Sequence, residues 1–124
     1  MAGLYSVRVS GSISAAHRLP DYPGPCARMH GHNFSVTAEL GANALAQGMV
    51  IDFVRLRAAM DAVLDRLDHT CLNDQPELDP PTAEVLAAFI YSRLAASLAD
   101  DRVRVLRVSV EESQGMSATY TEEA

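Results

Sequence analysis

Alternating apolar and polar positions predict strands near both ends of the chain. Every second residue of 4–14 is apolar or glycine, which is typical of a half-buried strand. The same alternation runs through 31–41 and predicts a second strand. A third, valine-rich strand is expected over 102–112, and its phase slips between Val105 and Leu106, which indicates a bulge.

The middle of the chain changes to helical spacing. One helix is expected over 53–67 with Asp52 as its N-cap, and another begins at Thr82 and reaches about Leu98. Their predicted inward faces are Phe53, Leu56, Met60, Val63, Leu64 and Leu67 in the first, and Val85, Leu86, Phe89, Ile90, Leu94 and Leu98 in the second. With a short last strand over 116–120, the order is ββααββ. It predicts an α+β fold in which a four-stranded antiparallel sheet carries both helices on one face.

Composition narrows the class of protein. With 124 residues, 48% of them hydrophobic, the chain fits a single domain, 1–124. It lacks an apolar run of membrane-spanning length and the pattern of a signal peptide, so we expect a cytoplasmic protein without a membrane partner. A net charge of −6 without a basic cluster argues against nucleic acid as a partner. Cys26 and Cys71 are too few for a disulfide framework and favour a functional thiol in a reducing compartment.

Three histidines carry the strongest chemical signal. His30 and His32 flank Gly31 at the start of the second predicted strand, and a two-residue interval in a strand places both imidazoles on one face. His17 follows the first strand, so paired strands would bring three neutral nitrogens to one tetrahedral centre. Three histidines with a fourth position left for water or substrate are the ligand set of a catalytic zinc ion, Zn²⁺.

Six motifs occur in an order that resembles the 6-pyruvoyl-tetrahydropterin synthase and 6-carboxytetrahydropterin synthase superfamily. They are Ala15-Ala-His-Arg-Leu19, Cys26-x-x-x-His-Gly-His-Asn-Phe34, Ile51-Asp-Phe53, Leu67-Asp-His-x-x-Leu-Asn73, Pro81-Thr-x-Glu84 and Val110-x-Glu112. The resemblance covers nearly the whole chain and implies the tunnelling fold, whose element order is the ββααββ read above. It also implies a zinc enzyme that acts on 7,8-dihydroneopterin triphosphate.

The short interval between Cys26 and His30 resembles the bacterial 6-carboxytetrahydropterin synthases of 7-deazaguanine and queuosine biosynthesis. The implied reaction is a lyase reaction that yields 6-carboxy-5,6,7,8-tetrahydropterin, acetaldehyde and triphosphate. A four-stranded sheet with two uncovered edges and apolar surface also predicts a homotrimer or homohexamer, as in the resembling family. In that family the counterparts of Asp68 and His69 are expected to reach the zinc site from a neighbouring subunit.

Each remaining candidate residue has an expected role. Cys26 is suited to act as the base once its thiol is deprotonated, and Asp68 to orient His69 for proton exchange. Glu112 can accept the adjacent N–H groups of the pterin in bidentate fashion. Thr82 is expected to begin the second helix first and to contact substrate second.

Plainer explanations exist for the same residues. Cys26 could be a fourth, structural zinc ligand, and the Asp68-His69 pair could be an ordinary helix C-terminal turn. Glu111 competes with Glu112, but alternation places the two on opposite faces, and the resemblance selects Glu112. Two other functions also fit: a 6-pyruvoyl-tetrahydropterin synthase, and a non-catalytic pterin-binding protein held together by zinc.

Overall fold

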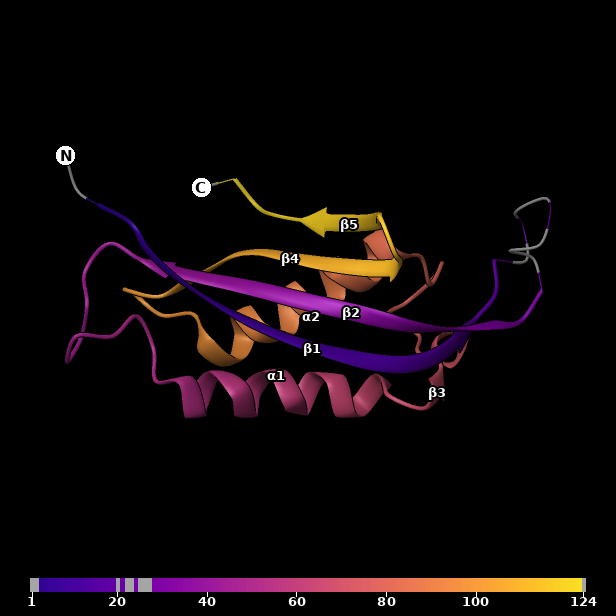
Figure 1. The fold of residues 1–124 in the computed structure, drawn as a ribbon, viewed down its shortest axis with the longest axis horizontal. Coiled ribbons are helices and arrows are strands. Elements are labelled where there is room, and N and C mark those ends of the chain that lie inside the picture. Colours follow the sequence, from indigo (N-terminus) through magenta and orange to yellow (C-terminus); the bar gives the residue numbers. More distant parts are fainter. Residues whose placement is uncertain (1–2, 20, 22–23, 25–27, 124) are drawn as a thin grey trace.

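Two long strands form the centre of the sheet in the computed structural model, which describes residues 3–19, 21, 24 and 28–123. The antiparallel strands are β1 (Tyr5–His17), β2 (His30–Ala42), β4 (Arg104–Ser113) and β5 (Met116–Tyr120). β1 and β2 pair along their whole length, β4 pairs with the other side of β2, and β5 pairs with β4. Figure 1 shows the resulting layer of strands, with the two helices beside it.

The prediction of four antiparallel strands is wrong in one respect. A fifth strand, β3 (Thr70–Cys71), pairs in parallel with Ala15 and Ala16 of β1, so the sheet is mixed and its order is β3-β1-β2-β4-β5. Two residues are too few to display an alternating pattern. The strand exists because the turn after the first helix returns the chain to the edge of β1.

The two helices begin at the expected caps. α1 (Phe53–Leu67) starts after Asp52, whose carboxylate accepts from the Val54 N–H at 2.8 Å. α2 (Ala83–Leu98) starts after Thr82, whose hydroxyl accepts from the Val85 N–H at 3.2 Å. A short 3₁₀ helix, η2 (Leu72–Asp74), follows β3. None of the described helices is long and apolar enough to cross a membrane.

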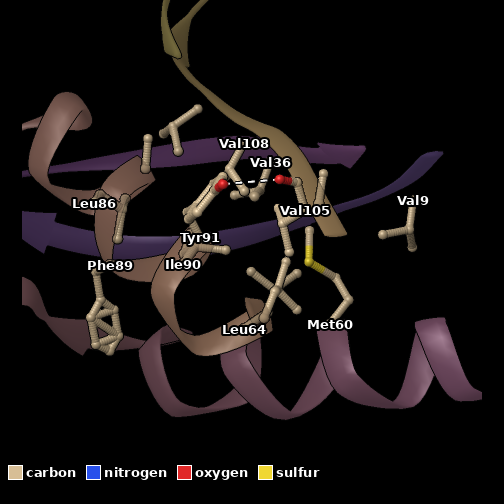
Figure 2. Close-up of a cluster of buried hydrophobic side chains, with 14 of the residues drawn as sticks. Val9, Val36, Met60, Leu64, Leu86, Phe89, Ile90, Tyr91, Val105 and Val108 are labelled. Carbon is tan, nitrogen blue, oxygen red and sulfur yellow. Dashed lines mark hydrogen bonds between the residues drawn. The ribbon is translucent and has the colours of Figure 1, made fainter. Parts of the chain in front are cut away.

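The hydrophobic core lies between one face of the sheet and the two helices (Figures 1 and 2). Gly11 permits the close approach of α1, because a Cβ there would lie only 2.5 Å from Leu64 Cδ1. One predicted core residue is wrong: Phe53 is 67% exposed, since it stands at the first position of α1, ahead of the first buried residue of that helix, Leu56.

The predicted slip in β4 is confirmed as a bulge. Glu39 of β2 lies opposite Arg107 and the next residue, Leu40, lies opposite Val105, which leaves Leu106 as the extra residue. The buried Tyr91 of α2 donates its hydroxyl hydrogen to the Val105 carbonyl at 2.9 Å, the bond drawn in Figure 2. A helix side chain thus bonds to the backbone where the ladder is interrupted.

Candidate metal centre

Three histidine side chains converge at the end of the two long strands. His17 ends β1 and lies directly opposite His30, the first residue of β2, while His32 lies opposite Ala15. Directly opposed residues project from the same face, so the register places all three rings together. The ring centroids are 4.5 Å apart for His17 and His30, 5.3 Å for His17 and His32, and 4.9 Å for His30 and His32.

Backbone carbonyls orient two of these rings. The Nδ1 of His17 lies 2.8 Å from the carbonyl oxygen of Pro81, immediately before α2, and the Nδ1 of His30 lies 2.7 Å from that of Arg28. A carbonyl can only accept, so each Nδ1 carries the hydrogen and each Nε2 of the neutral ring offers its lone pair. Carbonyls behind metal-binding imidazoles commonly set the tautomer in this way.

Glu112, a residue of β4, lies beside the three histidines of β1 and β2. Its Oε1 lies 3.1 Å from the Nε2 of His17 and 3.0 Å from the Nε2 of His32. The four residues each contribute one potential ligand atom, and these atoms all lie within 4.8 Å of one another. Sequence reasoning expected Glu112 to contact substrate and did not place it among the imidazoles.

The cluster is buried on the side of His17 and Phe34 and more exposed at His32 and Glu112. His17 is 1% exposed, and the fully buried Phe34 lies edge-on beneath it and His32, at centroid distances of 5.4 and 5.6 Å. Burial lowers the pKa of His32, as do the neighbouring imidazoles of His30 and His17, while Glu112 opposes them. The neutral imidazole that a metal ion requires is therefore favoured at His32.

This donor set fits a divalent cation. Neutral imidazoles and one carboxylate are ligands of zinc and of other first-row transition metals, so the donor atoms do not by themselves identify the ion. A cation would also separate lone pairs that otherwise face one another without a hydrogen between them. The cluster could therefore hold a metal ion.

Asp68 and His69 form a second polar group, at the C-terminal end of α1. Asp68 Oδ1 accepts from the Ser14 N–H at 2.7 Å, and the His69 N–H donates to the Ser14 carbonyl at 2.6 Å. The Oδ2 of Asp68 lies 3.0 Å from the Nδ1 of His69. The Ser14 N–H, followed by the hydrogen bond and charge of His69, lowers the pKa of Asp68 despite some opposing desolvation.

The His69 ring points away from the protein interior. Its side chain is 81% exposed, and its backbone is in the left-handed region with φ 58°. It lines a surface pocket of about 510 Å³ together with Ser14, His32, Asn33 and Cys71, among others. Asp68 is also the C-cap of α1, so the helix-turn explanation and an orienting role for its carboxylate are compatible.

Of the remaining candidate site residues, some lie in the described part of the chain and one does not. Cys26 lies outside the described residues. Thr82 is the half-buried N-cap of α2, whereas Glu111 is exposed and opposite Ser35. The carbonyls of Pro81 and Arg28 were missed, and no side-chain pattern could have indicated them.

Asn73 was noted only as part of a motif. Its amide accepts from the Arg18 N–H at 2.9 Å and donates to the Arg18 carbonyl at 3.0 Å. It therefore fastens the chain immediately after His17, where a one-residue displacement would move the first imidazole of the cluster.

Comparison with known proteins identifies the family to which the chain is similar. Residues 6–123 match the family model described as 6-pyruvoyl tetrahydropterin synthase. A protein of Archaeoglobus fulgidus, provisionally named 6-carboxy-5,6,7,8-tetrahydropterin synthase, is 38% identical, with 87% of this chain and 88% of the relative covered. The 6-carboxy-5,6,7,8-tetrahydropterin synthase of Synechocystis is 40% identical over 67% of this chain and 69% of its own. The structure of Caenorhabditis elegans 6-pyruvoyl tetrahydropterin synthase superimposes with a TM-score of 0.85 at 26% identity, covering 98% of this chain and 97% of that one.

Proposed function

The chain belongs to the 6-pyruvoyl tetrahydropterin synthase family, and from that premise we propose that it is a zinc-dependent 6-carboxytetrahydropterin synthase. The reaction converts 7,8-dihydroneopterin triphosphate and one water molecule to 6-carboxy-5,6,7,8-tetrahydropterin, acetaldehyde and triphosphate. Such a product would serve 7-deazaguanine and queuosine-type biosynthesis. The curated names of the Archaeoglobus and Synechocystis relatives favour the carboxy branch.

One observation carries the proposal: three imidazoles converge at the end of β1 and β2 in a chain of this family. We assign His17, His30 and His32 as the metal ligands and Zn²⁺ as the ion. When bound, the ion would hold the hydroxyl groups of the substrate side chain and stabilise negative charge on them.

We assign proton transfer to residues outside the cluster. Cys26 is the proposed base, and Asp68 orients His69 through Nδ1 so that the exposed ring can exchange a proton. Glu112 is the proposed acceptor for the N–H groups of the pterin. Thr82 lies next to Pro81, whose carbonyl orients His17, so its proposed contact with substrate would occur beside the cluster.

We further propose that the site is shared between copies of the chain in a homotrimer or homohexamer. The described part of β1 from Tyr5 to Ser14 has a strand neighbour only on its β2 side, and β5 is the last strand at the other edge. Tyr5, Phe53 and Val54, all more than half exposed, lie near the free part of β1. Pairing of these edges between subunits would cover the free strand edges and the exposed apolar side chains, and it would bring a neighbouring subunit close to the exposed His69.

A 6-pyruvoyl tetrahydropterin synthase is the alternative activity, and the likeness to the Caenorhabditis elegans enzyme is the observation that favours it. The third possibility is a metal-binding protein that retains pterin affinity without turnover.

Incubation of the zinc-loaded protein with 7,8-dihydroneopterin triphosphate, followed by mass analysis of the products, separates the three. The carboxy product with one equivalent of acetaldehyde supports the proposal. The pyruvoyl product identifies the alternative enzyme, and unchanged substrate at saturating protein contradicts both activities.

A further inference from the structure

The position of Glu112 suggests more than contact with substrate. The same carboxylate oxygen, Oε1, lies within 3.1 Å of the Nε2 atoms of His17 and His32. The Glu112 side chain is 32% exposed and reaches the cluster from β4, a different strand from those that carry the histidines. It therefore adds a carboxylate oxygen to the three imidazoles.

The hydrogen-bonding groups at this contact show why it needs a positive charge. The Nδ1 of His17 donates to the Pro81 carbonyl, so the Nε2 of the neutral ring carries a lone pair and no hydrogen. An ionised carboxylate also only accepts. Two acceptors at 3.1 Å repel each other unless a positive charge, either a proton on the ring or a metal ion, is shared between them.

The distances also match a set of metal ligands. Two ligands each about 2.0–2.2 Å from a tetrahedral ion are separated by roughly 3.3–3.6 Å along an edge of the tetrahedron. The separations of 3.0 and 3.1 Å between Oε1 and the two nitrogens are a few tenths of an ångström shorter than that edge, so a small outward movement of the carboxylate would make room for an ion.

We infer that the Glu112 carboxylate is the fourth ligand of the metal ion in the substrate-free protein, and that substrate displaces it. This inference rests on the proposed metal site at His17, His30 and His32. The resting centre then has four protein ligands, and the substrate hydroxyl groups take the place of Oε1. The displaced carboxylate becomes free to accept the N–H groups of the pterin, so both roles of Glu112 belong to one sequence of events.

The backbone around Glu112 is suited to such an exchange. Glu111 lies opposite Ser117 of β5 and Ser113 lies opposite Met116, which leaves Glu112 as the extra residue of a bulge. An extra residue is not held by the strand ladder on that side, and bulges commonly redirect side chains beside functional sites. The carboxylate can therefore move without breaking the pairing of β4 with β5.

The test uses the full-length protein loaded with Co²⁺ or Zn²⁺ and the Glu112→Gln variant. Loss of a carboxylate ligand should lower zinc affinity about tenfold or more and should change the visible ligand-field spectrum of bound Co²⁺ before any substrate is added. The matched control is Glu111→Gln, the exposed neighbour, which should leave both the affinity and the spectrum unchanged. Glu112→Asp keeps the charge at a shorter reach and provides a second variant if the glutamine form is unstable.

Substrate displacement has its own readout. Adding a non-reactive dihydropterin with a hydroxylated side chain should change the parent Co²⁺ spectrum, because a hydroxyl oxygen replaces the carboxylate. An unchanged spectrum at saturating ligand would overturn the displacement. Unchanged zinc affinity and an unchanged spectrum in Glu112→Gln would overturn the inference. So would a thiolate-to-cobalt charge-transfer band that disappears in Cys26→Ala, because sulfur would then hold the fourth position. If the parent bound neither metal, the proposed metal site itself would fail, which is a different result.

Discussion

The imidazole cluster and the Asp68-His69 turn lie at the same end of the sheet. The side chains of the cluster contact one another within a single chain, whereas the His69 side chain points into solvent. In the cluster, four potential ligand atoms lie within 4.8 Å, and His17 is almost fully buried. In the turn, hydrogen bonds to Ser14 hold the backbone while the His69 side chain is 81% exposed. We therefore expect metal binding to be a property of the single chain and proton transfer to require a neighbour.

Electrostatics separates the two regions further. Burial and the neighbouring imidazoles lower the pKa of His32, which favours the neutral imidazole. The Ser14 N–H and His69 lower the pKa of Asp68, which favours a charged carboxylate. The first region could hold a cation, and the second holds a carboxylate beside an exposed imidazole.

The largest expected effect tests the cluster. His30→Ala removes one of three imidazoles and should abolish nearly all bound zinc, because two histidines and a carboxylate hold the ion far less tightly. Metal content after gel filtration, with circular dichroism as a check of folding, measures the loss. His69→Ala is the matched control and should keep about one zinc per chain. Retention of zinc by His30→Ala would remove this histidine from the ligand set.

The next effect tests the other region. His69→Ala and Cys26→Ala should each lower turnover by roughly a hundredfold or more while zinc content and fold are retained, as for loss of a positioned proton-transfer group. Steady-state kinetics of the zinc-loaded variants provides the measurement. Turnover within a few-fold of the parent would remove that residue from the proposed relay.

Mixing the two inactive variants tests whether the relay is shared between chains. A one-to-one mixture reassembled from dissociated chains should regain about a quarter of the parent turnover, since each of two neighbouring copies is the correct variant half of the time. Sedimentation of the mixture establishes that it has assembled. A fully active monomer, or assembled mixed oligomers with no regained turnover, would contradict a shared site.

The smallest expected effect concerns acid stability. The folded-state pKa of Asp68 is lowered from the ordinary value of 3.8, so the unfolded chain binds this proton at a higher pH than the folded chain does. The stabilisation is therefore present above the ordinary pKa and is lost as the pH falls through the folded-state pKa. Asp68→Asn can still accept from the Ser14 N–H and should show a shallower loss of thermal stability on acidification. Asp65→Asn, an exposed position on α1, is the control; equal acid profiles for parent and Asp68→Asn would refute the prediction.

Local pattern was sufficient for much of the fold. The limits of α1, its N-cap Asp52 and the bulge at Leu106 follow from spacing within a few residues, because a helix turn or a strand alternation involves only near neighbours. The spacing of His30 and His32 works in the same way, since a two-residue interval in a strand always selects one face. These features would be readable in any chain with the same segments.

Other features depend on contacts between segments that are distant in the sequence, and only the tertiary structure reveals them. β3 forms only because the turn after α1 lies beside β1, and Phe53 is exposed because its position in the first turn of α1 precedes the buried face. The approach of Glu112 to His17 depends on the register of three strands and a second bulge, across 95 residues of sequence. The amino-acid pattern thus determined which side chains share a face, whereas the register between distant strands decided which of them meet, because that register is set by packing of the whole core.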